Sequence, residues 1–539
     1  MSNLIKKGKC FMSLAIAIVL ALGTLSGCGG GSKGESSNGD SSSGVSSKDE
    51  SKASDKENVF IYSRSATIPG WDPIVNATGQ NIILNLMHYE TLVTSYTESG
   101  EYEGELATDW AVSDDSLTWT FNLRKDVKWH NGDPFTSADV ETSFNRLLED
   151  PLCASTLAAI AGLESVEAPD NYTIILHMSQ PNATMLSFLD TFFIFSDKLY
   201  KEMGNDMFNY TDTIKPIGTG AFICDKYTVG GDAEFVRNDD WWGWQAGTKS
   251  NVDRIIYRPI TEEATRIAGM QTGELDLIDK VSSEYKETLE AVDGLKVESL
   301  SSSEMIYLGF ACDRGIFQDV NARKAAFYAI DRELIAQSIA GSGRGASCPV
   351  TTNTIGFKEG SVVPAQDLEL AKEYLAKSGY NGETLVMLCS NGLFARSKEV
   401  YQAIASMLTE AGFVIDLQVM DNATVTSLRN EGKYNLLVTN VIQSNDPQNY
   451  LLTRWVGDVH NAGYKNDEMF GLINDALQEM DETKREDLLL KAFDIAWEEV
   501  APHTAIYQTE TILAYKDTIS GFENHDIRNY FDFSRVVKN

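Results

Sequence analysis

The stretch from Ala107 to Arg146 carries the clearest pattern of apolar and polar residues in the chain. Apolar and polar side chains alternate from Thr118 to Leu123, which is the pattern of a strand with one buried face. A second short strand is expected from Val127 to Trp129, after a charged turn. Thr136 then begins a helix, because its hydroxyl and the Asp139 carboxylate are placed to cap the amides of the first turn. These elements predict a small packed α+β unit without a catalytic group of its own.

Helices and strands alternate along the rest of the chain. Apolar residues recur at helical spacing in segments 81–92, 261–273, 319–339, 364–379, 398–412, 466–478 and 484–500. Alternating or continuously apolar runs predict strands at 59–63, 173–178, 252–259, 384–389, 413–419, 434–440 and 504–514. The order strand, helix, strand across 384–419 favours a sheet that is at least partly parallel.

The first residues have the composition of an export signal. Lysines precede a short apolar run, Phe11 to Leu22, which is too short for a spanning helix and is typical of a signal peptide over residues 1–27. The following Leu-Ser-Gly-Cys resembles a bacterial lipobox, which implies that Cys28 becomes the lipidated first residue of the mature chain. An ordinary signal peptide cleaved nearby, or a buried cysteine, is the alternative.

Residues 28–58 form the lipidated cysteine and a linker of Gly, Ser, Lys, Asp and Glu with almost no apolar content. Such a segment cannot bury enough surface to offset the entropy of ordering, so a flexible tether is expected. The sequence therefore predicts a globular body held outside the cell membrane by a lipid, in an expected Gram-positive host. A lipobox alone does not exclude an inner or outer membrane anchor.

The body is long enough for two or three lobes, and its charge is strongly acidic, with a formal net charge of −33 for the chain. This charge disfavours nucleic acid as a partner and is interpreted as an aid to solubility rather than as a cation-binding feature. No C-x-x-C motif signals zinc or a redox dithiol. Buried thiols and one or two disulfides both fit the spacing of the cysteines of the body, which are Cys153, Cys224, Cys312, Cys348 and Cys389.

Three motifs carry a family resemblance. The first is W-x2-S-x-D-x-L-T-W-T-F-x-L-R-x-D-V-K-W-H-x-G-x-P-F-T-x2-D-V-x2-S-F within 107–146. The second combines P-I-G-T-G-A-F at 216–222 with N-D-D-W-W at 238–242, and the third is N-x-R-K-A-x2-Y-A-I-D-R-E at 321–333. Together they resemble the extracellular solute-binding proteins of family 5, the substrate-binding subunits of peptide and nickel ABC importers.

The resemblance implies an α/β, two-lobed periplasmic-binding-protein-like fold of the cluster C type with an extra α+β domain. By analogy, lobe I comprises 59–89, 214–304 and 508–539, accessory domain II comprises 90–213, and lobe III comprises 305–507. A monomer without cofactor would capture a solute, most simply an oligopeptide or dipeptide, in an interlobe cleft, close around it and deliver it to the permease subunits.

The resemblance also implies a ligand-binding loop from Asn440 to Pro447. Peptide-binding relatives meet the free amine of the peptide with an aspartate in this loop, and that position falls at Gln443 here. A neutral amide can accept a hydrogen bond from an ammonium group but lacks its charge complement. Asp446 can shape the turn before Pro447. The candidate ligand contacts are therefore Ser63, Trp71, Tyr89, Arg396, Asn440, Gln443 and Asp446, with Trp71 and Tyr89 also suited to the core and Arg396 to an exposed surface.

Other classes of function find little support in the sequence. The histidines are scattered, and no H-x-x-H, H-E-x-x-H or calcium loop is present, so no direct metal site is expected. A chelate bound whole, a sugar or another small solute stays open as the ligand. No G-x-S-x-G elbow or Cys/His pair supports an enzyme. A tethered ligand sensor is the remaining alternative to transport.

Overall fold

The computed structural model describes residues 57–539 apart from 69, 76–78, 96–100, 158, 159, 161, 212, 353, 359–363, 444, 445, 458–461 and 522–530. These residues belong to one compact unit, Lys56–Asn539. The predicted signal peptide, Cys28 and the predicted tether lie outside the described residues. Within the described ranges, no helix is long and apolar enough to cross a membrane.

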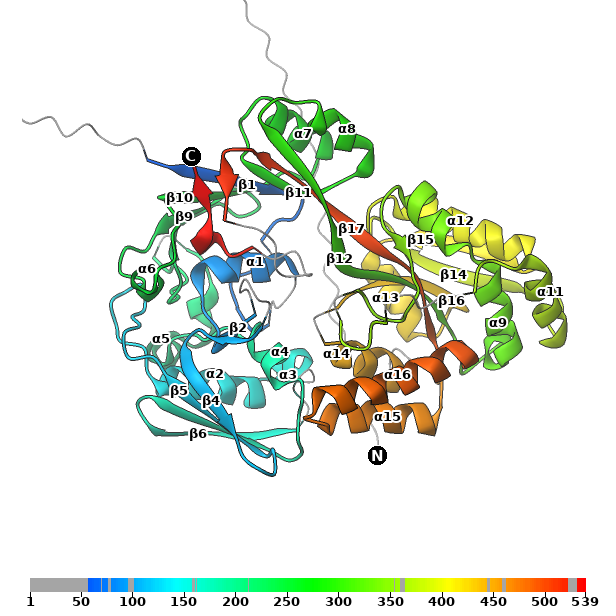
Figure 1. Ribbon diagram of the computed structural model, residues 1–539, viewed down its shortest axis with the longest axis horizontal. Helices are drawn as coiled ribbons and strands as arrows, with labels where there is room; N and C mark the ends of the chain where they lie inside the picture. The colour runs from blue at the N-terminus through cyan, green and yellow to red at the C-terminus, as the bar shows by residue number, and fades with distance from the viewer. Residues whose placement is uncertain are drawn as a thin grey trace, which may run out of the picture. The chain divides into compact units, whose positions relative to one another are not determined.

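One mixed sheet organises the unit (Figure 1). Its strands follow the order β15-β14-β16-β12-β17-β11-β1-β10-β9-β8, and β13 pairs with β17 at one side. Their bounds are β15 Val414–Met420, β14 Thr384–Ser390, β16 Leu436–Ile442, β12 Leu295–Phe310, β17 His503–Lys516, β11 Leu277–Val281, β1 Val59–Arg64, β10 Arg254–Pro259, β9 Ala233–Arg237, β8 Phe222–Tyr227 and β13 Arg344–Gly345. We call β14, β15 and β16 the β14 half of the sheet, and β1 with β8 to β11 the β1 half.

Two long antiparallel strands, β12 and β17, join the halves. They pair from Leu295 opposite Lys516 to Gly309 opposite His503, with a register shift between Ser301 and Met305. The outer edge of β12 pairs with β16, whereas β17 pairs with β11. In Figure 1 these two strands run side by side between the two groups of helices and strands. The proposed lobe boundaries at 304/305 and 507/508 fall within these strands and stay predictions.

The predicted parallel pairing is confirmed in both halves. β14 runs parallel to β15 and β16, and β1 runs parallel to β10 and β11. In the β14 half, α12 (Ser397–Glu410) connects β14 to β15 and buries Val400, Tyr401 and Ile404 against the sheet. This strand-helix-strand order is the one expected from the sequence.

The remaining helices pack around these strands. Their bounds are α1 Gly79–His88, α7 Glu263–Gln271, α8 Lys286–Glu290, α9 Val320–Ala329, α11 Leu368–Lys377, α13 Asn422–Asn430, α14 Gln448–Leu451, α15 Asp467–Gln478 and α16 Glu482–Glu499. Side-chain caps fix several helix starts. Asn466 accepts a hydrogen bond from the Met469 amide at 2.9 Å, and Asp481 accepts one from the Lys484 amide at 3.0 Å.

The prediction of one helix over 319–339 is wrong. Helix α9 ends at Ala329, and Ile330 has an extended backbone. A short helix, α10 (Arg332–Leu334), begins again after Asp331 and continues as a π-helix, Ile335–Ala340. The break lets the buried Arg332 guanidinium donate to the Ala505 carbonyl of β17 at 3.0 Å. A buried charge therefore outweighs the helical periodicity of this segment.

A separate four-stranded sheet contains the stretch from Ala107 to Arg146. Its order is β4-β5-β7-β6, with bounds Ala107–Val112, Thr118–Leu123, Thr173–Met178 and Leu163–Asp170. Helix α2 (Ser137–Glu149) packs beside it and has Thr136 as its N-cap residue, where the helix was expected to begin; Asp139 accepts a hydrogen bond from the Thr136 amide at 2.8 Å. The strand expected from Val127 to Trp129 is wrong, because only an isolated bridge between Lys128 and Pro134 forms there.

Small elements complete the described fold. They are β2 Val93–Thr94, β3 Glu103–Gly104, β18 Ile519–Ser520, β19 Val537–Lys538, α3 Ala154–Leu157, α4 Met185–Leu189, α5 Asp197–Met203 and α6 Trp242–Ala246. The five cysteines of the body are free and buried, so the alternative of disulfides among them is excluded. They lie in separate apolar clusters: Cys153 packs with the four-stranded sheet, which we call the accessory sheet, Cys224 packs with the β1 half, and Cys312, Cys348 and Cys389 pack with the β14 half.

Candidate functional site

The β12–β16 ladder divides the candidate loop between two faces of the sheet. Glu304 lies opposite Ile442 and Ile306 opposite Asn440, and the Gln443 amide continues the ladder by donating to Ser303 O at 2.9 Å. Side chains of paired residues share a face and successive residues alternate. Asn440 and Glu304 therefore share one face, and Gln443 lies on the other.

On the first face, a half-buried carboxylate gathers neutral hydrogen-bond donors. Asn440 Nδ2 donates to Glu304 Oε1 at 2.6 Å. Thr509 Oγ1, on β17, lies 3.4 Å from Glu304 Oε2 and 3.3 Å from its backbone oxygen. All three side chains are half-buried. Among the described residues, no lysine, arginine or histidine forms an ion pair with Glu304.

On the second face, Gln443 is held inside the protein. Its side chain is 2% exposed. Oε1 accepts from the Thr351 amide at 2.8 Å, while Nε2 donates to the Tyr307 hydroxyl at 2.5 Å and lies 3.3 Å from Pro349 O. Both ends of the amide are thus occupied by the protein.

Asp446 is also held by the protein. Its carboxylate forms an ion pair with Nη1 of Arg485, and both side chains are largely buried. The same carboxylate accepts a hydrogen bond from the Gln448 amide at 2.9 Å, at the start of α14. The two residues between Gln443 and Asp446 lie outside the described part of the chain. Asp446 shapes the turn before Pro447 through these contacts, as the sequence suggested.

The candidates Ser63, Trp71 and Tyr89 lie in the β1 half. Trp71 and Tyr89 are 5% and 1% exposed and belong to its apolar core. The Trp71 ring lies 5.2 Å from that of Tyr227, and the Tyr89 ring lies 4.8 Å from that of His88. Ser63, in β1, is buried opposite Arg258 and Ile278. These three residues and Asn440 therefore come from different halves of the sheet.

Arg396 is exposed and immediately precedes α12, with a positive backbone φ of 52°. Its guanidinium lies against Gly341, where an added Cβ would come within 3.1 Å of Nη1. The same Cβ would clash with Ser283 Oγ, which follows β11. Arg396, which packs with the β14 half, therefore lies close to the segment that follows β11 in the β1 half.

Lys280 brings a positive charge to the same region from the β1 half. It lies in β11 at an irregularity in the pairing with β17 and has a positive φ of 52°. Its side chain is exposed to solvent. The protein atoms around it and the Arg64 charge lower the pKa of Lys280, while Glu304 and Asp279 act in the opposite direction. Arg64 itself pairs with buried Asp279, with Nε 2.9 Å from Oδ2.

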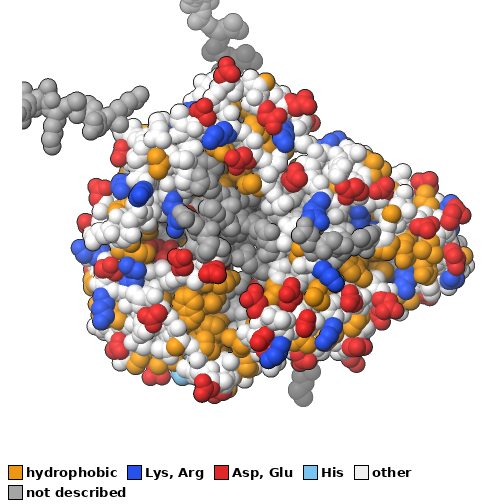
Figure 2. All heavy atoms as spheres, viewed as in Figure 1, with side chains coloured by type: hydrophobic (Ala, Val, Ile, Leu, Met, Phe, Trp, Pro, Cys, Tyr) orange, Lys and Arg blue, Asp and Glu red, His pale blue; other side chains and the backbone are white. Residues whose placement is uncertain are grey.

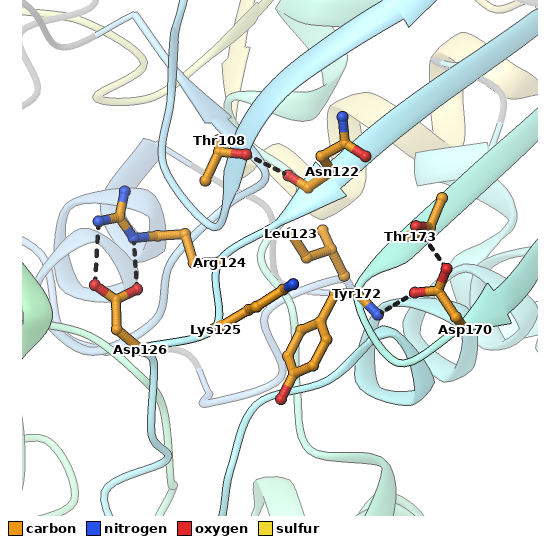
Figure 3. Close-up of a pocket in the computed structure, with 9 residues that line it drawn as sticks. All are labelled: Thr108, Asn122, Leu123, Arg124, Lys125, Asp126, Asp170, Tyr172 and Thr173. Atoms are coloured by element: carbon orange, nitrogen blue, oxygen red, sulfur yellow. Dashed lines mark hydrogen bonds and ion pairs between the residues drawn. The ribbon is translucent and has the colours of Figure 1, made fainter.

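Within the described ranges, no group of three or more His, Cys, Asp or Glu side chains is arranged to hold a metal ion. A pocket in the accessory sheet, shown in Figure 3, is lined by residues of β4, β5, β6 and β7 and by Arg124, Lys125, Asp126 and Tyr172. Its charges are engaged locally, since Arg124 stacks 3.6 Å from the Trp242 ring centre and bonds to Asp126 at 3.2 Å. Asp170 accepts from the Tyr172 amide at 2.8 Å.

Acidic side chains are spread over the face in Figure 2, with basic side chains between them. This distribution agrees with the interpretation of the net charge as an aid to solubility.

The sheet thus has two halves joined by β12 and β17, with the polar groups of Glu304, Asn440 and Thr509 beside these strands. The family model of bacterial extracellular solute-binding proteins, family 5, matches residues 101–463, and the chain belongs to this family. Members of the family are non-enzymatic components of transporters, so the chain is not an enzyme.

Similar proteins agree with this family and this fold. A "Putative ABC transporter peptide-binding protein" of Brucella ovis is 27% identical over 347 residues, which cover 63% of this chain and 64% of the relative. The binding protein DppA of Helicobacter pylori, solved with the peptide STSA, has a TM-score of 0.77 at 23% identity, covering 89% of this chain and 98% of DppA. NikA of Brucella suis, solved with Fe(III)-EDTA, has a TM-score of 0.78 at 21% identity. The match covers 90% of this chain and 100% of NikA.

Glu304 and Lys280 lie outside the motifs that the sequence offers as ligand contacts. Glu304 follows three serines, and no motif marks it. Its contacts to Asn440 and Thr509 join residues 136 and 205 positions apart. A carboxylate in a serine-rich run next to the third motif is the one local signal that could have drawn attention to it.

Proposed function

We propose that this chain is the substrate-binding subunit of an ABC importer and that its solute is an oligopeptide or dipeptide. The observation that carries the proposal is membership of family 5 together with relatives named as peptide-binding proteins. A ligand that contacts both halves of the sheet stabilises the closed arrangement, which then docks on the permease. No bond is made or broken in this cycle.

The ligand contacts follow from accessibility. We assign ligand contact to Asn440 and Arg396, because Asn440 is half-buried and Arg396 is exposed. Ser63, Trp71, Tyr89, Gln443 and Asp446 are assigned to the walls that hold the contact residues in place, since each is buried or bonded within the protein. Ligand backbone groups can pair with an exposed strand edge, which gives affinity with limited side-chain discrimination.

The location outside the cell membrane is part of the proposal. A signal peptide over residues 1–27 and a lipid on Cys28 would tether the body through residues 29–58. Expression in a bacterium with radiolabelled palmitate tests the anchor: wild-type protein should carry label and fractionate with membranes, and Cys28→Ala should lose both properties. Label retained by Cys28→Ala would place the lipid elsewhere or reject it.

A non-peptide solute is the second candidate, and one comparison favours it. NikA shares this fold and was solved with a metal chelate, so the fold itself does not select peptides. Native mass spectrometry of the protein purified from its own host would weigh any ligand that stays bound. Masses of short peptides are expected, and a single chelate or sugar mass would replace the peptide proposal by the second candidate.

Thermal shift provides an independent test in solution. A lysine-free tetrapeptide library is expected to raise the melting temperature, because a ligand that binds only the folded state stabilises it by mass action. Fe(III)-EDTA and a sugar mixture serve as comparison ligands. A shift with either of these and none with peptides would contradict the peptide proposal.

A further inference from the structure

Glu304 differs in its partners from the buried carboxylates of Asp276 and Asp279, which lie near the paired strands β12 and β17. Asp279 pairs with Arg64 at 2.9 Å, and Asp276 pairs with Lys516 at 2.6 Å and with Lys538 at 2.7 Å. Glu304 is half-buried, and among the described residues its carboxylate is hydrogen-bonded only by the neutral groups of Asn440 and Thr509. A carboxylate withdrawn from water without a cation is costly to hold unless something binds there. We infer that the Glu304 carboxylate receives a primary ammonium group of the transported solute.

The groups around Glu304 suit an ammonium ion. An ammonium has three donors and needs several acceptors. Asn440 directs Nδ2 to Glu304 Oε1, so its Oδ1 is an acceptor that can serve a second ammonium proton. Glu304 Oε2, which has only the long contact to Thr509, can serve another. Ionised acceptors make hydrogen bonds roughly twice as strong as neutral ones.

Aromatic side chains stand beside this carboxylate. Tyr507 on β17 lies opposite Ile306, on the same face as Glu304, and is 1% exposed. Burial raises the pKa of Tyr507 and of Tyr401 well above the usual value, and the Glu304 charge acts in the same direction on both. The Phe394 ring lies 6.3 Å from that of Tyr507 and 5.5 Å from that of Tyr401. Aromatic rings next to an anion are well placed to attract an organic cation.

The geometry shows that Gln443 cannot share the binding of the ammonium group with Glu304. Gln443 is on the opposite face, and its amide is occupied by Tyr307 and Thr351. Lys280 is the competing cation, because it approaches from the β1 half and senses the Glu304 charge. The rival explanation is that Lys280 and Glu304 form an ion pair that holds the halves together, and the variants below distinguish the two.

The inference rests on the proposed function and deepens it, because it names the group on the peptide that is recognised. Two sources supply the same chemistry, the amino terminus and a lysine side chain. Three probes separate them: a lysine-free tetrapeptide library, the same library acetylated at its amino termini, and an amino-terminally acetylated library that ends in lysine. Apparent Kd values are measured for the mature full chain by tryptophan fluorescence and native mass spectrometry.

Three variants accompany the wild type. Glu304→Gln removes the charge with little change of shape, Lys280→Met removes the competing cation, and Glu410→Gln alters an exposed carboxylate at the end of α12 as the matched control. Circular dichroism checks the fold. The comparison of free with acetylated libraries on wild-type protein requires no variant, so the inference stays testable if Glu304→Gln does not fold.

If the amino terminus is the recognised group, acetylation should weaken wild-type binding at least tenfold. If a lysine side chain supplies the ammonium group, the acetylated library that ends in lysine should bind at least tenfold more tightly than the acetylated lysine-free library. Glu304→Gln should lose most of this difference, whereas Glu410→Gln and Lys280→Met should keep it. Wild-type binding that responds neither to acetylation nor to the terminal lysine, or an undiminished effect of these groups in Glu304→Gln, overturns the inference while leaving peptide transport intact. Equal losses in Glu304→Gln and Lys280→Met support the ion pair instead and also overturn it. Failure of all three libraries to bind the wild type rejects the peptide function itself, and the inference with it.

Discussion

Gln443 illustrates how a single side chain can support a loop without touching what the loop binds. Its amide meets the Tyr307 hydroxyl, the Thr351 amide and Pro349 O on the face away from Asn440. Tyr307 in turn stacks on Tyr450, with ring centres 5.0 Å apart. The amide therefore ties β12 to the loop after β16 and to the segment around residue 350.

Replacing Gln443 by alanine should destabilise the protein. The change leaves the buried Thr351 amide without its acceptor, whereas the Tyr307 hydroxyl still donates to Pro349 O at 2.6 Å, and an unsatisfied buried group costs about 1–3 kcal/mol. We expect the free energy of unfolding in urea to fall by about 1–3 kcal/mol. Gln402→Ala, on the exposed side of α12, is the matched control and should change it by less than about 0.5 kcal/mol. Equal stability of the two variants would contradict a structural role for Gln443.

At the scale of elements, a histidine joins the loop before α2 to the turn before β8. His130 Nδ1 accepts from the Gly218 amide at 3.2 Å, so the ring proton belongs on Nε2, which lies 2.9 Å from Gly220 O. The His88 ring lies 4.8 Å away, and its Nδ1 accepts from the Cys224 amide at 3.3 Å. A second proton on either ring would face a donor rather than an acceptor. Two neutral imidazoles therefore join the accessory sheet to the β1 half.

This junction should make the fold sensitive to acid. Burial lowers the pKa of His130 to about 4, and burial and then His130 lower that of His88. The unfolded chain, with histidine pKa values near 6.5, binds more protons below that pH, so stability is lost as pH falls from about 6.5 toward 4. His130→Gln should lose less stability over this range than the wild type, by on the order of 2 kcal/mol. Urea unfolding at pH 7, 5.5 and 4.5 measures the difference.

The control for this titration is His177→Gln, which alters a half-buried histidine of β7 in the four-stranded sheet and should keep the wild-type pH dependence. Glu90 contributes with the opposite sign, because burial raises its pKa to about 7 and its neutral form is favoured at lower pH. That contribution is common to all three proteins and cancels in the comparison. Parallel pH profiles for wild type and His130→Gln would contradict the assignment.

At the scale of the whole molecule, the described body is held without covalent crosslinks. The five cysteines are free and buried. Burial raises the pKa of each thiol, to about 11 for Cys153, Cys312 and Cys348 and to about 12 for Cys224. Thiol chemistry requires the thiolate and access to it, and both are suppressed in the folded state.

A mature chain carrying Cys28→Ser should therefore be inert to Ellman's reagent while folded. All five remaining thiols should react after denaturation in guanidinium chloride, and the melting temperature should be the same with and without reductant. A drop in melting temperature on reduction would reveal a disulfide and contradict the structure.

Local pattern predicted much of the fold and little of the candidate site. The alternation in β5 and the capping residues of α2 are signals contained within a few residues, and both elements form as expected. β12 was not predicted, because its serine-rich middle has no clear alternation and its partners in β16 and β17 lie far along the chain. Glu304 was missed for the same reason. The helix over 319–339 failed because the buried Arg332 bonds to β17.

The paired strands β12 and β17 also define an axis about which the two halves of the sheet can rotate. If one half of the sheet turns against the other, the ribbon of β12 and β17 must twist, and its pairing is already interrupted by the register shifts between Ser301 and Met305 and between Ile306 and Tyr307. Atoms near a rotation axis sweep short arcs, whereas atoms at the rim sweep long ones. Glu304 lies beside these shifts, so a group bound to it would keep its contacts throughout the swing. Such a ligand would bind first near the rotation axis, and the outer surfaces of the two halves would then close around it.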